Sequence, residues 1–247
     1  MEVTGARRSR AAPPALVVTC EHGGNTIPAE YRPLFRGYRG ALESHRGYDP
    51  GALLMARELA RTYRAPLVAS TVSRLLVELN RSPHHRALYS DRTRSLSPTE
   101  KARIVARYYD PYRQAVETRI RGYVRAGRRV LHVSSHSFTP VLDGETRETD
   151  VGILYDPKRA LERELCTRWT ALLAARIAPL RVRRNYPYRG YNDGLTTFLR
   201  RRFPERAYAG VEIEVNQKHA RTGGSHWRVL RRQIVASVGD LLNEEAT

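Results

Sequence analysis

The sequence predicts one α/β domain in which a mixed, mostly parallel sheet lies between two layers of helices. Short apolar runs alternate along the chain with longer amphipathic stretches, which is the pattern of a parallel sheet covered on both faces. The 247 residues fit one large domain, and 41% hydrophobic residues suffice for its core. No repeat, low-complexity segment or linker divides the chain. We therefore expect a domain over residues 15–247, preceded by a flexible, basic lead over residues 1–14.

The first strand is expected over residues 16–20, a short apolar run with β-branched residues. It runs out into Glu21, His22 and two glycines, which we expect to adopt backbone angles that a side chain would forbid. In open α/β sheets, ligands bind beyond the carboxyl ends of the strands. Glu21 and His22 therefore lie where chemistry is usually done.

Helix starts are marked by two patterns. Asp49-Pro50 and Asp156-Pro157 each place aspartate at an N-cap and proline at the first helical position, and Ser97 with Glu100 forms a capping box. Helices are expected over residues 49–64, 97–125, 156–177, 193–202 and 225–242. Further strands are expected over residues 66–71, 75–79, 129–135, 151–155, 180–184 and 208–216. A short irregular or helical piece is expected over residues 30–35 and a polar loop over residues 143–148.

The net charge of +18 favours no particular partner. Arginine outnumbers lysine forty to three and is scattered along the chain, with small knots at 181–184 and 200–202. No nucleic-acid module signature is present, so we expect a solvated basic surface and no specific nucleic-acid binding. Two cysteines make no disulfide framework, and no segment is long and apolar enough for a membrane span or a signal peptide. We therefore expect a cytoplasmic protein.

Polar residues at strand ends are the candidates for chemistry. Glu212 and Glu214 lie two apart in a predicted buried strand and so share one face. Such a pair needs a partner, which is a metal ion, a catalytic water or, less specifically, two arginines. His22 and His136 with a carboxylate would make a zinc site with an open fourth position, as in hydrolytic zinc enzymes. Asp49 is the best carboxylate for it.

Each candidate also has a purely structural interpretation. His22 could hydrogen-bond within a turn, and Asp49 could serve as an N-cap with or without a second role. His132 is expected to be packed rather than a ligand. Arg74 and Arg81 flank a predicted strand and could bind an acidic substrate, but in a chain with forty arginines they could equally be surface charge.

Six motifs in order resemble the N-formylglutamate amidohydrolase family over about residues 16–242. They are Glu21-His22-Gly23-Gly24, Tyr48-Asp49-Pro50-Gly51-Ala52, Ser73-Arg74 with Glu78-Leu79-Asn80-Arg81, His136-Ser137-Phe138, Asn185-Tyr186-Pro187-Tyr188 and Val211-Glu212-Ile213-Glu214-Val215-Asn216-Gln217. The resemblance implies a zinc-dependent amidohydrolase with a zinc carboxypeptidase-like fold and a mixed eight-stranded sheet. It also implies cleavage of the formyl or acyl amide of a small acidic amino acid.

The resemblance also assigns roles. Zinc carboxypeptidases place a glutamate where this chain has Asn25, so the carboxylate ligand moves to Asp49, with Glu21 as the runner-up. Glu214 is expected as the general base in preference to Glu212. The residues expected to bind the substrate carboxylate are Arg74, Asn80 and Arg81, with Asn185 and Tyr188.

The alternative function is a non-catalytic basic protein that binds an anionic partner on the same scaffold. A hydrolase requires the two histidines, Asp49 and Glu214 to converge in one pocket. A binding protein requires the arginine knots to be contiguous on a surface.

Overall fold

The computed structural model describes residues 12–245, so most of the expected lead over residues 1–14 lies outside the described part. A central sheet of six strands has the order β2-β1-β3-β8-β6-β7, and every neighbouring pair is parallel except β6 and β8. The expected α/β fold with a mixed, mostly parallel sheet is confirmed. The strands are β1 (Ala15–Cys20), β2 (Leu67–Ala69), β3 (Val130–Phe138), β6 (Val151–Leu154), β7 (Val182–Arg184) and β8 (Tyr208–Asn216).

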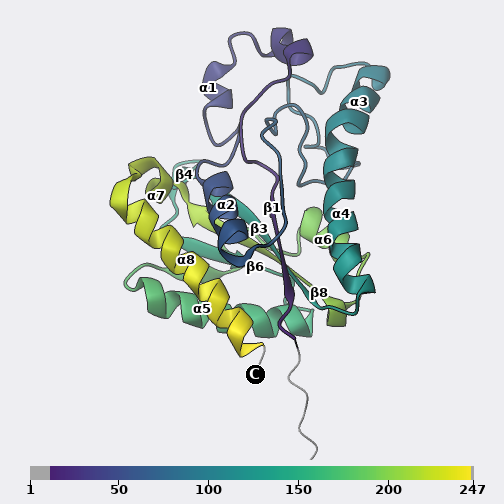
Figure 1. The fold of residues 1–247 in the computed structure, drawn as a ribbon. Coiled ribbons are helices and arrows are strands. Elements are labelled where there is room, and N and C mark those ends of the chain that lie inside the picture. The colour runs from purple at the N-terminus through teal and green to yellow at the C-terminus, as the bar shows by residue number, and fades with distance from the viewer. Residues whose placement is uncertain (1–11, 246–247) are drawn as a thin grey trace, which may run out of the picture.

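Helices cover both faces of this sheet (Figure 1). One face packs against α2 (Ala52–Tyr63), α5 (Ala160–Ile177) and α8 (Gly224–Glu244), and the other faces α3 (Pro98–Ile104), α4 (Asp110–Arg125) and α6 (Leu195–Arg200). Each face has its own apolar core. Because side chains alternate along a strand, the odd-numbered residues of β3 and β8 enter the first core and the even-numbered ones face the second.

None of the described helices is long and apolar enough to cross a membrane. Short elements connect the layers of the fold. Strands β4 (Val141–Leu142) and β5 (Glu145–Thr146) pair as a small hairpin where a polar loop was expected. The described residues therefore hold six strands in the sheet and two in the hairpin, rather than one sheet of eight. The other elements are η1 (Ala29–Phe35), α1 (Arg39–Leu42), η2 (Val105–Tyr109), η3 (Glu205–Ala207) and α7 (Gln217–Thr222).

Three further expected elements differ in the structure. Residues 75–79 form turns rather than a strand, although the backbone N–H of Glu78 does donate to the carbonyl of Leu88. The long helix begins as expected, with the Ser97 hydroxyl accepting from the backbone N–H of Glu100 at 3.2 Å, but π-helical turns over 105–109 interrupt it. Helix α5 begins at Ala160, after the Asp156-Pro157 turn.

Gly23 and Gly24 are required for a reason other than the expected one. Neither has a positive φ. A Cβ on Gly23 would lie 2.8 Å from the carbonyl oxygen of Ser70, and one on Gly24 would lie 2.8 Å from that of Thr71. The turn after β1 is thus pressed against the chain that follows β2, and only residues without a side chain permit this approach.

Candidate metal and catalytic site

Three neighbouring strands bring the polar residues together. In the parallel pairing of β3 and β8, His136 is registered with Glu214 and Ser134 with Glu212. All four are even-numbered, so they share the sheet face that looks toward α4 and α6. His22 follows the end of β1, the strand on the other side of β3.

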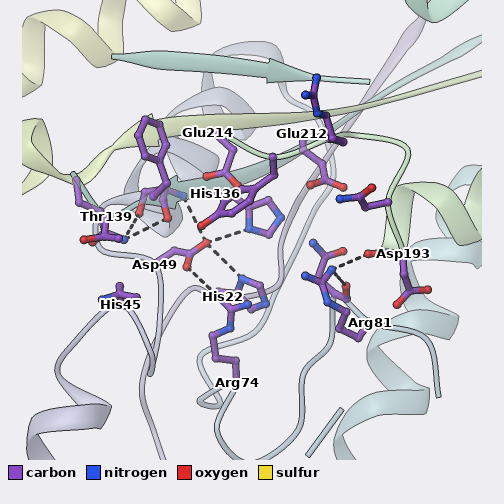
Figure 2. Close-up of a pocket in the computed structure, with 17 residues that line it drawn as sticks. His22, His45, Asp49, Arg74, Arg81, His136, Thr139, Asp193, Glu212 and Glu214 are labelled. Carbon is purple, nitrogen blue, oxygen red and sulfur yellow. Dashed lines mark hydrogen bonds and ion pairs between the residues drawn. The ribbon is translucent and has the colours of Figure 1, made fainter. Parts of the chain in front are cut away.

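Two histidines converge on one carboxylate oxygen in this cluster (Figure 2). The distance from Asp49 Oδ2 to His22 Nδ1 is 3.3 Å, and from Asp49 Oδ2 to His136 Nδ1 it is 3.0 Å. One ligand atom from each residue lies within 4.8 Å of the other two, and all three residues are buried. Ligands around tetrahedral zinc, at bond lengths of roughly 2.0–2.1 Å, lie about 3.3 Å apart. The donor set and spacing therefore fit a zinc ion.

Each imidazole has a second carboxylate behind it. His22 Nε2 pairs with Glu78 Oε1, and His136 Nε2 lies 3.0 Å from Glu21 Oε2. Metal-binding histidines usually donate their other ring N–H to a carboxylate in this way, which fixes the ring and its tautomer. The runner-up ligand Glu21 thus lies on the side of His136 away from Asp49.

Glu21 is itself held by donors from two elements. The hydroxyl of Ser134 donates to Oε2 at 2.5 Å and that of Tyr112, on α4, donates to Oε1 at 2.7 Å. Glu21 has no exposed surface. Burial alone would raise its pKa, but the hydrogen bonds from His136, Ser134 and Tyr112 outweigh burial and hold the pKa well below its usual value.

Asp49 and Glu78 resemble Glu21 in the direction of their pKa shifts. Burial opposes ionisation of Asp49 and Glu78, yet the charge of His22 at Asp49, and that of Arg74 at Glu78, lower both pKa values. Burial would likewise lower the pKa of His136, but the hydrogen bonds that it donates to Asp49 and Glu21 raise it well above its usual value.

Asp49 does not cap α2, although the Asp49-Pro50 pattern predicts that it does. The N-cap of α2 is Gly51, with φ +85°, and no side chain caps the helix. Instead, the backbone N–H of Asp49 donates to the carbonyl of His22 at 2.9 Å, which places its carboxylate between the histidines. Gly51 permits this turn, since a Cβ there would lie 2.7 Å from that of Ala220.

Glu212 and Glu214 differ in their hydrogen bonds. Glu212 Oε1 accepts from the hydroxyl of Thr196 at 2.7 Å. Glu214 is 5% exposed, and its buried Oε2 has no hydrogen-bond partner among residues 12–245. Burial, opposed by the charge of His136 and reinforced by that of Asp49, raises the pKa of Glu214 to about 8. An unpaired buried carboxyl is costly, and its presence beside Asp49 marks a functional group.

The expected substrate-binding residues do not behave alike. The guanidinium group of Arg74 is already paired with two carboxylates. Its Nε donates to Glu78 Oε2 at 2.7 Å, and its Nη1 lies 3.4 Å from Asp49 Oδ1. Arg81 has carbonyl partners alone among the described residues, those of Asn80 and Asp193. Asn80 accepts from the backbone N–H of Leu195 through Oδ1, which leaves its amide nitrogen for the pocket.

A cavity of about 180 Å³ opens beside this cluster. Of the expected residues Tyr188 and Asn185, Tyr188 lines this cavity and Asn185 does not. Asn185 Oδ1 accepts from the backbone N–H groups of Tyr155 and Gly190, so it shapes the loop that carries Tyr188. The lining residues are His22, His45, Asp49, Arg74, Asn80, Arg81, His136, Ser137, Phe138, Thr139, Tyr188, Arg189, Asn192, Asp193, Glu212, Glu214 and Gln217.

Sequence reasoning gave no role to Glu78 or His45. Glu78 opens the motif Glu78-Leu79-Asn80-Arg81, and an acid in an otherwise apolar stretch was the available signal. No sequence signal marks His45, which reaches the pocket from the loop before Asp49. His132 is packed as expected, with Thr19 Oγ1 at 2.9 Å and the Tyr208 hydroxyl at 2.8 Å.

The arginine knot at 200–202 is divided between the interior and the surface, since Arg200 is buried whereas Arg201 and Arg202 are exposed. Arg200 is 8% exposed, and its Nε donates to Glu162 Oε1 at 2.9 Å. Its Nη1 donates to the carbonyl of Gly190 and its Nη2 to that of Gly210. Arg200 therefore contributes no charge to the continuous basic surface that a non-catalytic anion-binding protein requires.

Comparisons with known proteins agree with this architecture. A structure of the gene product Atu2144 from Agrobacterium tumefaciens is similar at 31% identity and TM-score 0.81, covering 96% of this chain and 94% of that one. An N-formylglutamate amidohydrolase from Ralstonia eutropha JMP134 shares the fold at 20% identity and TM-score 0.69, covering 95% and 96% of the two chains. No curated protein matches the chain significantly. The N-formylglutamate amidohydrolase profile matches residues 14–220, and the chain belongs to that family.

Proposed function

We propose that this amidohydrolase uses zinc to cleave the N-formyl or N-acyl amide of an acidic amino acid. The convergence of both histidines on Asp49, beside the unpaired carboxyl of Glu214, carries the proposal. The activity named for the Ralstonia eutropha protein supports the substrate class. Two buried free cysteines agree with a cytoplasmic location, which is part of the proposal.

His22, Asp49 and His136 would hold the zinc ion. When bound, zinc polarises an amide carbonyl and makes a water molecule more acidic. Glu214 accepts a proton from that water at Oε2 and delivers it to the leaving nitrogen. The charge of Asp49 helps to raise the pKa of Glu214, and a cation held by Asp49 would offset that charge and favour the ionised form of Glu214 that accepts a proton.

Arg81 and the amide of Asn80 would bind the carboxylate of the amino acid. Arg81 is chosen over Arg74 because the guanidinium of Arg74 is already paired with Glu78 and Asp49. The cavity of about 180 Å³ lies below the range of roughly 300–1,000 Å³ typical of drug-sized ligands. A single amino-acid derivative suits it better than a peptide.

Metal content tests the site directly. Purified protein is expected to hold near-stoichiometric zinc, and His22→Ala or His136→Ala is expected to lose it, because each removes one of three protein ligands. His132→Ala is the matched control, since this buried histidine lies outside the cluster. Full zinc retention by both ligand variants would refute the site.

The two glutamates of β8 test the assignment of the base. Glu214→Gln keeps the shape of the side chain and removes the proton acceptor, so turnover of N-formylglutamate should fall by roughly a hundredfold or more while zinc and folding are retained. Glu212→Gln, at the carboxylate already paired with Thr196, should have the smaller effect. Near-normal turnover by Glu214→Gln with abolished turnover by Glu212→Gln would show that the wrong glutamate was chosen.

A further inference from the structure

The pocket continues past the cluster of His22, Asp49 and His136, on the side away from Arg81. In Figure 2, Arg81 and Asp193 lie on one side of Asp49, and His45 and Thr139 lie on the other. Both sides line the same cavity. A substrate whose amino-acid carboxylate lies at Arg81 and whose amide lies at Asp49 therefore directs its acyl group toward His45.

His45 is held in place but has no partner. In the loop that carries it, the carbonyl of Gly47 accepts from the Ser73 hydroxyl at 2.9 Å and from the backbone N–H of Arg74 at 3.3 Å. The imidazole of His45 lines the pocket and makes no hydrogen bond or ion pair with any residue in the described range 12–245. Its ring nitrogens are available to a ligand.

Positive charge surrounds this imidazole. Burial, followed by the charges of Arg221, Arg74, Arg46 and Arg147, lowers the pKa of His45. Two of these arginines have carboxylate partners, since Arg74 pairs with Asp49 and Glu78, and Arg46 lies 3.9 Å from Asp91.

The other two arginines are not neutralised. Over residues 12–245, neither Arg147 nor Arg221 forms an ion pair with a carboxylate. Each instead touches a residue of the pocket wall: Arg147 Nη1 donates to the Tyr188 hydroxyl at 3.1 Å, and Arg221 Nη2 donates to Gln217 Oε1 at 3.5 Å. Two guanidinium groups without a carboxylate partner, held against the wall of the cavity that His45 also lines, are together with that imidazole a donor set for an anion.

We propose that His45, Arg147 and Arg221 form a second anion subsite, which binds a carboxylate carried by the acyl group of the substrate. This inference rests on the proposed amide hydrolysis. A formyl group has no atoms beyond its carbonyl that could reach the subsite, whereas the monoamide of a dicarboxylic acid carries a free carboxylate at its far end. Water then cleaves the amide C–N bond, and the products are the dicarboxylic acid and the free amino acid.

A matched pair of substrates tests the charge alone. N-succinyl-L-glutamate and N-succinamoyl-L-glutamate have the same size, and only the first carries a terminal carboxylate on its acyl group. Because hydrogen bonds to charged groups are worth more than neutral ones, kcat/KM is expected to favour the succinyl compound by roughly tenfold or more. Equal kcat/KM values for the two compounds would overturn the proposal.

Variants of the subsite residues then test which side chains cause the preference for the succinyl compound. Arg147→Gln combined with Arg221→Gln is expected to bring the ratio of the two kcat/KM values close to one, and His45→Ala is expected to reduce it. Arg228→Gln, at an exposed arginine of α8, is the matched control and should keep the ratio of the unmodified protein. An unchanged ratio in the double variant would refute the assignment of these arginines.

Calorimetric binding to the Glu214→Gln protein separates this proposal from the proposed function. Tighter binding of the succinyl compound, lost in the arginine double variant, supports the subsite even if the unmodified protein hydrolyses neither compound. Hydrolysis of N-formylglutamate without any preference between the matched pair supports the proposed function and overturns the subsite.

Discussion

His132 gives the protein a component of stability that depends on pH. The side chain has no exposed surface, and its ring nitrogens contact Thr19 and Tyr208. Burial lowers the pKa of His132 to about 4, from an ordinary value of 6.5. At pH values between these two pKa values, His132 is therefore protonated in the unfolded chain and neutral in the folded chain. The stability that neutral His132 permits is complete above about pH 6.5 and is lost as the pH falls toward 4.

The loss follows from the two pKa values. Between about pH 7.5 and about pH 5, protonation of His132 in the unfolded state alone should reduce the free energy of unfolding by about 2 kcal/mol. Urea unfolding of the unmodified protein and of His132→Gln, at both pH values, isolates this contribution, because the shared acidic groups cancel in the difference. His132→Gln should lose less stability on acidification, by about this amount. Equal losses in the two proteins would refute the reasoning.

Three further predictions concern other parts of the molecule. Glu21→Gln should weaken zinc binding roughly 10–100-fold, because the carboxylate behind His136 is lost; unchanged affinity in a chelator competition would contradict this role. Gly190→Ala should destabilise the protein by about 3 kcal/mol or more in urea unfolding, since its Cβ would lie 2.1 Å from the backbone nitrogen of Tyr155; a stability near that of the unmodified protein would count against the close approach. DNA binding should be weak and steeply salt-dependent, and sequence-specific binding at physiological salt would contradict this.

The sequence predicts the buried frame of the fold well. Strands β3 and β8 and helix α8 are long and strongly patterned, so local periodicity is enough to find them. Residues 75–79 carry the same kind of apolar run but form turns, because their apolar side chains enter the core without pairing in the sheet. An apolar run therefore predicts burial more safely than it predicts a strand.

In the candidate site, too, some features could be predicted from the sequence and others could not. The convergence of His22 and His136 could be predicted, because both follow from where parallel strands end. The roles of Glu21 and Glu78 could not, since they depend on which atoms of each imidazole face which carboxylate. Asn185 was assigned to the substrate because it belongs to a motif, and its part in shaping a loop depends on a backbone contact with Gly190 that spacing does not reveal.

The uncapped start of α2 separates the stability of this helix from the site beside it. An aspartate before proline would normally stabilise the first turn of a helix by about 1 kcal/mol, yet the N-cap of α2 is Gly51 and the carboxylate of Asp49 lies in the buried cluster. A substitution at residue 49 chosen for its helix propensity would therefore gain nothing at the helix and would remove the charge on which both histidines converge. A search for stabilised variants of this enzyme should leave that residue fixed.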